Sequence, residues 1–131
     1  NTIKFCRKSG YVNNIFGRRS HFNGINDKNF NVRNFQERAA INAPIQGSAA
    51  DIIRLAMIKI NRLIEEDKKL QKKMLLQIHD ELIFECSEKD EKYIKKTIKE
   101  AMVSISKSEY HMFSIPLEVN VNSGYNWGEV H

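Results

Sequence analysis

The chain has 131 residues and a net charge of +5, with 41% hydrophobic and 28% charged residues. This length fits one domain or part of one, and the composition excludes disordered, collagen-like and low-complexity proteins. No apolar run reaches the roughly 18 residues that mark a membrane-spanning helix. The two cysteines lack the spacing of a disulfide framework or a zinc cluster. We therefore expect a protein of a reducing, cytoplasmic compartment with no membrane partner.

The first forty residues hold the excess positive charge. They carry eight Lys and Arg against two acidic residues, whereas the remaining 91 residues carry 13 against 14. Asn1–Ser9 is typical of the last turns of a helix closed by Gly10, and two short strands are predicted on either side of Gly17. Their turn would present Arg18 and Arg19, a pair of guanidinium groups suited to phosphate. This concentration of charge predicts a surface for a polyanion, or else only a basic face that aids solubility.

Two helices are predicted next, Val32–Asn42 and Ser48–Glu66, because apolar residues recur in both at helical period. Pro44 would separate them, since proline cannot donate a helical hydrogen bond. The second helix would begin at Ser48 and Asp51, which have the spacing of a capping box.

Arg38, Asn42 and Gln46 follow one another at intervals of four residues. On one continuous helix they would share a face, where the arginine could bind phosphate and the amides could reach base edges. Minor-groove acceptors occupy the same places in every Watson–Crick pair, so such amides would sense correct pairing without reading sequence. The spacing also fits the solvated face of an ordinary amphipathic helix, and Pro44 would break the alignment.

Two apolar runs, Met74–His79 and Leu82–Cys86, predict a β-hairpin with His79, Asp80 and Glu81 at its tip. Tight hairpin turns usually contain a glycine or asparagine that accepts positive φ, and this one contains neither. Backbone strain and repulsion between the acids would have to be offset, and a divalent cation is the simplest candidate. The alternative is a plain turn with solvated acids.

A further helix is predicted to open at Ser87, with Ile94 and Ile98 on its buried face. A half-buried strand is predicted over Pro116–Val121, where polar and apolar residues alternate. The order helix, hairpin, helix, strand predicts an α+β fold in which an antiparallel sheet packs on amphipathic helices.

These segments resemble a known family. The sequence ERAAINAPIQGSAADII, followed further along by LLQIHDELIFE, is similar to the C-terminal part of a family A DNA polymerase of the bacterial DNA polymerase I type. GYVNNIFGRR resembles that family's fingers hairpin, and GYNWGEVH resembles its C-terminus. The resemblance implies that residues 1–42 form the basic end of the fingers subdomain. Residues 43–131 would form the C-terminal part of the palm, with its antiparallel sheet and catalytic hairpin.

The resemblance also implies roles for individual residues. Asp80 would be a ligand of a pair of catalytic Mg²⁺ ions, with Glu81 as an auxiliary acid and His79 near the primer terminus. The residues expected to contact DNA are Arg38, Asn42, Gln46, Arg18 and Arg19.

The implied activity is template-directed DNA synthesis, a two-metal nucleotidyl transfer to a primer 3′-hydroxyl. Its partners would be primer–template DNA, deoxynucleoside triphosphates and the remainder of a polymerase chain, in the bacterial cytoplasm near the nucleoid. Because the second set of metal ligands is expected upstream of Asn1, these 131 residues alone are expected to be inactive. Alternatives from other classes are a non-catalytic nucleic-acid-binding module, a decayed gene fragment, or a metal nuclease that uses His79 and Asp80.

Overall fold

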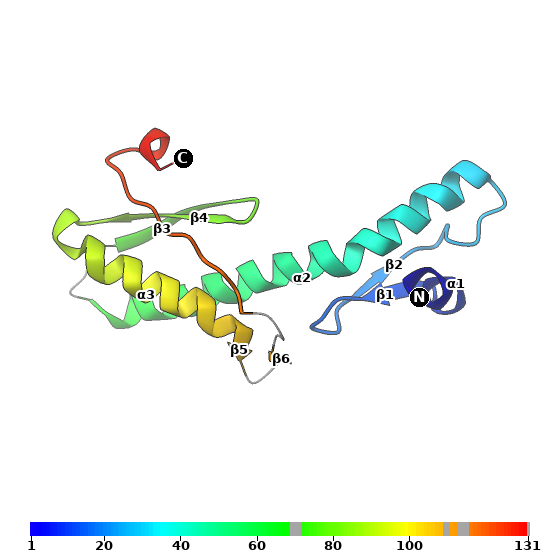
Figure 1. The fold of residues 1–131 in the computed structure, drawn as a ribbon, viewed down its shortest axis with the longest axis horizontal. Coiled ribbons are helices and arrows are strands. Elements are labelled where there is room, and N and C mark those ends of the chain that lie inside the picture. The colour runs from blue at the N-terminus through cyan, green and yellow to red at the C-terminus, as the bar shows by residue number, and fades with distance from the viewer. Residues whose placement is uncertain (69–71, 109–110, 113–115, 131) are drawn as a thin grey trace. The chain divides into compact units, whose positions relative to one another are not determined.

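The computed structural model describes residues 1–68, 72–108, 111–112 and 116–130 (Figure 1). The chain divides into two compact units, Asn1–Asp51 and Ile52–His131. Its elements are α1 (Thr2–Ser9), β1 (Tyr11–Asn13), β2 (Arg19–His21), α2 (Phe30–Glu66), β3 (Lys72–Ile78), β4 (Glu81–Cys86), α3 (Glu91–Val103), β5 (Lys107–Ser108) and β6 (His111–Met112). Short 3₁₀ turns cover Glu88–Asp90, Ser104–Ser106 and Trp127–Glu129. This mixture of helices with antiparallel strand pairs confirms the predicted α+β class.

The first unit begins with the predicted helix end and hairpin. Helix α1 stops at Gly10, whose φ of 78° is left-handed and whose amide donates to the carbonyl oxygen of Cys6 at 2.7 Å. Strands β1 and β2 pair antiparallel, with Asn13 opposite Arg19. They are shorter than predicted, so Arg18 lies in the connecting loop whereas Arg19 belongs to β2.

The core of this unit is small. Cys6 and Ala40 are completely buried, and Val12 and Ile25 nearly so, which brings α1, β1 and the early part of α2 into contact. Cys6 and Ala40 contribute less to stability than a large aliphatic side chain such as Ile25, because burial energy follows apolar area.

Helix α2 is continuous from Phe30 to Glu66 and contains Pro44, so the prediction of two separate helices was wrong. The prediction that Ser48 starts a helix was also wrong. Its Oγ donates to the Pro44 carbonyl oxygen, one turn earlier, at 2.5 Å. Proline in a helix interior costs about 3 kcal/mol, and packing on both sides of it offsets that cost. Ala40 lies in the core of the first unit and Ile60 in that of the second.

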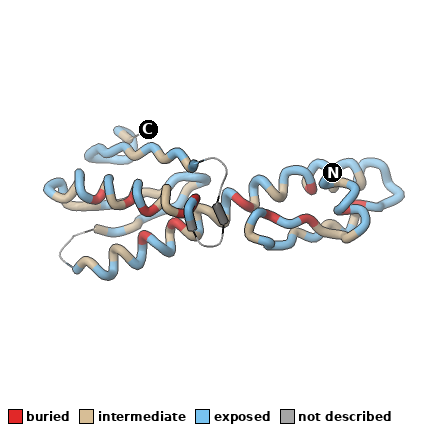
Figure 2. Tube along the Cα trace, turned by 60° about the horizontal axis from the view of Figure 1, so that its bottom comes forward, coloured by how far each residue is buried: buried red, intermediate tan, exposed pale blue. Residues whose placement is uncertain are grey.

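The second unit packs α2 and α3 against the β3–β4 hairpin (Figure 1). Ile60, Ile94, Ile98 and Ala101 are buried together, and Phe84 of β4 packs against them. The buried stripe predicted for α3 is confirmed, and Figure 2 shows buried residues recurring at intervals along the helices. Each buried isoleucine contributes roughly 1.5 to 3 kcal/mol, so this layer anchors the hairpin.

The strand predicted over Pro116–Val121 is not formed. In the described part of the chain, strands pair as three two-stranded hairpins, none of which includes this segment. Burial nevertheless alternates, with Leu117, Val119 and Val121 half-buried between exposed neighbours. The period of two correctly predicted which side chains turn inward, but pairing also requires a neighbouring strand edge.

Candidate catalytic and nucleic-acid-binding sites

The tip of the β3–β4 hairpin is a two-residue turn of His79 and Asp80, because Ile78 pairs directly with Glu81. His79 has a φ of 50°, in the left-handed region that favours glycine. Gln77 Nε2 donates to the His79 carbonyl oxygen at 2.6 Å, which holds the turn in place. The strain expected of a turn without glycine is therefore present, and it falls on the histidine.

The tip projects its functional groups into solvent. His79, Asp80 and Glu81 are all exposed, and Asp80 has no hydrogen bond or ion pair with any described residue. Within the described ranges, no three His, Cys, Asp or Glu side chains lie close enough together to hold a metal. Mg²⁺ prefers carboxylate oxygens and is commonly held by one or two of them, together with water and substrate phosphates. The tip fits that ion as one part of a ligand set.

The structure places Arg38, Asn42 and Gln46 on the single helix α2, where all three are exposed. Because the helix continues through Pro44, the spacing of four residues keeps them on one face. None of the three side chains has a polar partner among the described residues. Their hydrogen-bonding groups are therefore available to a ligand.

Arg18 and Arg19 have different surroundings, although sequence reasoning treated them as a pair. Arg18 Nε donates to Asp51 Oδ2 at 2.9 Å, and its Nη2 donates to the Gly47 carbonyl oxygen at 3.3 Å. The hydrogen bond that Arg18 donates to Asp51, together with the negative charge of that carboxylate, raises the pKa of Arg18. The guanidinium carbon Cζ of Arg19 instead lies 4.4 Å from the centroid of the Tyr11 ring, and the side chain has no hydrogen bond to a described residue. Arg19 is thus the arginine that is better placed to bind phosphate.

Sequence reasoning missed the role of Asn14, which is 8% exposed. Its Nδ2 donates to the Gly47 carbonyl oxygen at 3.2 Å and to Asp51, and its Oδ1 accepts from the Phe16 and Arg18 amides, both at 3.0 Å. An asparagine just before a glycine turn is a typical Asx turn, and that was the available signal.

Hydrogen bonds join Asn14 and Arg18 to Gly47 and Asp51, and the backbone amide of Ile15 donates to Ser48 Oγ. We call these six residues the loop–helix latch. It joins the β1–β2 loop to α2.

Comparison with known proteins decides the family. A family model described as DNA polymerase family A matches residues 1–129. The chain belongs to DNA polymerase family A. It is 40% identical over 129 residues to DNA polymerase I of Caldicellulosiruptor bescii and 48% identical over 127 residues to DNA polymerase I of Rhizobium leguminosarum. These alignments cover 98% and 96% of this chain, but the chain spans only 14% and 12% of the two relatives.

A solved structure shows the same fold. It is the POL domain of Pol1 from M. smegmatis in complex with DNA primer–template and dNTP, with a TM-score of 0.88 and 40% identity. The match covers 98% of this chain and 22% of that one. The family resemblance inferred from the sequence motifs is therefore confirmed. Separately, no helix in the described ranges of this chain is both long and apolar enough to cross a membrane.

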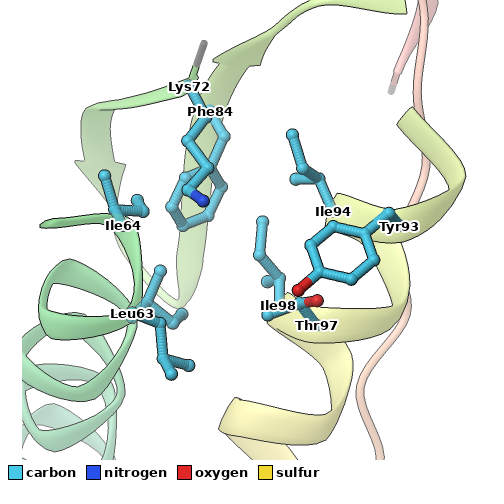
Figure 3. A pocket seen from close by; sticks show the side chains of 9 residues that line it. Leu63, Ile64, Lys72, Phe84, Tyr93, Ile94, Thr97 and Ile98 are labelled. Atoms are coloured by element: carbon cyan, nitrogen blue, oxygen red, sulfur yellow. The ribbon is translucent and has the colours of Figure 1, made fainter. Parts of the chain in front are cut away.

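This family A chain also has a small hollow in its second unit, between α2, the hairpin and α3 (Figure 3). Its volume is about 20 Å³, and its walls are mostly apolar, including Leu63, Phe84 and Ile98. That volume holds about one water molecule, and apolar walls favour an empty space. The hollow is a packing gap and is too small for a nucleotide.

Neither cysteine of the chain is an activated nucleophile. Cys6 is completely buried, and burial raises the pKa of its thiol. Burial also raises the pKa of the half-buried Cys86, and the negative charges of Glu91 and Asp90 add to the effect. A raised pKa leaves less thiolate at neutral pH, so both side chains serve packing.

Proposed function

We propose that this chain takes part in template-directed DNA synthesis, as the portion of a polymerase that supplies one metal-binding carboxylate and a surface for the primer–template duplex. The observation that carries the proposal is Asp80. It is an exposed carboxylate without a partner among the described residues, on a strained two-residue turn, in a chain of DNA polymerase family A. An acid held in this way has no evident role in stability, and strain at such a position is typical of functional sites.

The hairpin tip would hold its three polar side chains beside the metal ions and the primer terminus. Asp80 would be a ligand of Mg²⁺, Glu81 an auxiliary acid, and His79 would face the primer terminus. A bound pair of Mg²⁺ ions favours deprotonation of the primer 3′-hydroxyl and stabilises charge on the phosphates. Such a pair would need carboxylates from more than one segment of a polymerase. The described residues hold no such cluster, so further ligands must come from other parts of a polymerase. We therefore expect the 131 residues alone to bind DNA without extending a primer.

The DNA-binding surface would use the exposed face of α2. Arg38 would contact backbone phosphate, and Asn42 and Gln46 would donate to the minor-groove acceptors common to all correct pairs. Arg19 would add a phosphate contact from β2. The partners would be primer–template DNA, deoxynucleoside triphosphates and the remainder of a polymerase. The M. smegmatis complex, which contains both nucleic acid and nucleotide, supports this assignment.

Two further assignments accompany this function. The two named relatives are bacterial polymerases, and we propose a bacterial cytoplasmic location beside the nucleoid DNA.

We also propose that residues 1–42 end the fingers and that residues 43–131 belong to the palm. This boundary lies inside α2, nine residues before the compact units divide.

The decisive test is Asp80→Asn in the full-length polymerase. Loss of the charge should reduce primer extension by several orders of magnitude, because metal positioning is lost, while duplex affinity stays nearly unchanged. Single-turnover extension and equilibrium DNA binding measure the two effects. Glu85→Gln is the matched control, since it removes an exposed acid from the same hairpin away from the tip. Wild-type extension by the Asp80 variant would refute the assignment.

A further inference from the structure

We propose that the loop–helix latch is a positioning device, which fixes the course of α2 across Pro44 and thereby keeps Gln46 aligned with Arg38 and Asn42. The proposal rests on the proposed function of that helix face, and it gives roles to Asn14, Arg18 and Asp51, which lie outside the face itself. These three side chains would act on DNA synthesis only through α2.

Helix α2 is weakest at the place where this alignment matters. Pro44 lies between Asn42 and Gln46, and it has no amide hydrogen to donate to the carbonyl of Ala40 one turn earlier. Gly47 follows three residues later and adds conformational freedom. Relative to alanine, a proline inside a helix favours a bend and a glycine favours fraying. Without outside contacts, the segment from 44 to 47 is where the helix would bend.

The latch holds the helix on the far side of the proline. The Gly47 carbonyl oxygen accepts from Asn14 Nδ2 at 3.2 Å and from Arg18 Nη2 at 3.3 Å. Asp51 accepts from Arg18 Nε at 2.9 Å, and Ser48 Oγ accepts from the Ile15 amide at 3.1 Å. Two consecutive residues of the β1–β2 loop, Asn14 and Ile15, and the arginine Arg18 thus bind a single helical turn.

The near side of the proline is held by the same hairpin. Ala40 is completely buried, in a cluster with Val12 of β1 and with Cys6 and Ile25. Val12 and Asn14 are two residues apart, so one short stretch of chain contacts α2 before and after Pro44. Contacts on both sides of Pro44 from one short stretch of chain should keep α2 from bending at the proline.

The latch also explains why the two neighbouring arginines differ. Arg18 directs two of its donors to Asp51 and Gly47, and the Asp51 carboxylate balances its charge. Arg18 is therefore a positioning residue, whereas Arg19 keeps its guanidinium donors free for phosphate. This assignment changes the role predicted for Arg18 from the sequence.

The test is a double-mutant cycle in the full-length polymerase, with kcat and KM measured on matched and mismatched primer termini. Asp51→Ala should lower kcat on a matched terminus by about 10- to 100-fold, as expected for a small misplacement of a contacting group. In a Gln46→Ala background the same change should have little further effect, because both variants lose one interaction. Arg19→Ala is the control. The decrease in kcat that it causes should add to the decrease caused by Gln46→Ala.

The outcomes separate the two proposals. If Gln46→Ala alone changes neither kcat nor mismatch discrimination, the function proposed for the helix face is wrong. If Gln46→Ala has its effect but Asp51→Ala adds fully to it, the latch does not act through Gln46 and the inference fails. Should Asp51→Ala lose its folded circular dichroism signal, Asp51→Asn replaces it. Its amide oxygen still accepts from Arg18, so we expect partial rescue of kcat, and a loss as large as that of Gln46→Ala would refute the latch.

Discussion

The two compact units are stabilised by different kinds of contact. In Asn1–Asp51, a small core is supplemented by polar side chains that bind backbone atoms, as Asn14 and Arg18 both do at Gly47. In Ile52–His131, large aliphatic side chains such as Ile60 and Ile98 form the contact layer. The polar groups at the hairpin tip lie outside that layer, and Asp80 has no hydrogen bond or ion pair with a described residue.

This contrast shows why residue type alone does not reveal a role. A guanidinium group is part of the scaffold in Arg18 and is free to bind a ligand in Arg38, although both belong to the same basic segment. The difference depends on whether an acceptor such as Asp51 has been brought within reach by the fold. Polar residues that stabilise a unit and polar residues that bind ligands can therefore be told apart by their partners.

Removing apolar contacts should damage the second unit most. Ile60→Ala should lower the free energy of unfolding by about 2 to 5 kcal/mol, because the truncated side chain is 1% exposed and leaves a cavity. Amide hydrogen exchange in the full-length protein measures this loss for each unit. Ile58→Ala, at a position 47% exposed on the same helix, should change it by less than about 0.5 kcal/mol. Equal effects of the two variants would contradict the assigned core.

A polar substitution should have its largest effect in the first unit. Asn14→Ala removes donors from Gly47 and Asp51 and should cost about 1 to 3 kcal/mol, the usual penalty for unpaired buried groups. Hydrogen exchange should accelerate in residues 1–51 and remain unchanged in the second unit. Asn13→Ala, next to it but exposed in β1, is the control. A change that spread evenly over both units would argue against a local latch.

Gly47→Ala should stabilise the first unit by about 0.5 to 1 kcal/mol, because alanine restricts the unfolded chain and favours helix. An added Cβ would meet Arg18 Nη2 at 3.4 Å and Asn14 Cβ at 3.6 Å, which are ordinary contacts. Thermal unfolding measures the gain. A lower Tm would mean that the latch is packed too tightly to accept a methyl group.

The rate at which each cysteine is chemically modified measures the opening of its own unit, since Cys6 lies in the first unit and Cys86 in the second. The changes in these rates are the smallest effects that we expect. Their raised pKa values mean that the folded state retains the thiol proton, so the associated stabilisation is full below the ordinary thiol pKa and declines as the pH rises through the folded value. Iodoacetamide should therefore modify Cys6 and Cys86 more slowly than free cysteine at pH 8. Asn14→Ala should accelerate modification of Cys6 alone, and Ile60→Ala that of Cys86 alone. Mass spectrometry of labelled peptides resolves the two rates.

Much of the fold could be predicted from the sequence, because its signals were local. Gly10 ended α1 as expected, and the apolar runs around the tip gave the β3–β4 hairpin. The errors arose where distant contacts override local preference. Pro44 and Ser48 have the signals of a helix boundary, but burial of Ala40 and Ile60 keeps one helix through both.

The candidate site was predictable to the same extent. Motif and spacing, both of which are read along the chain, gave Asp80 and the series Arg38, Asn42 and Gln46 as candidates. Asn14 and Asp51 were not, because their contact joins residues 37 positions apart and has no periodic signal. Such pairs are fixed by how a loop packs on a helix, which only the folded structure shows.

Under the function proposed for the hairpin tip, the left-handed backbone of His79 costs stability at a residue that serves catalysis. A glycine at that position would adopt a φ of 50° without steric cost and should release about 1 to 2 kcal/mol. We expect His79→Gly to raise the Tm of the polymerase while slowing primer extension, and a faster enzyme would refute this view. A hairpin engineered at this one residue for a higher Tm would then have a lower rate of primer extension.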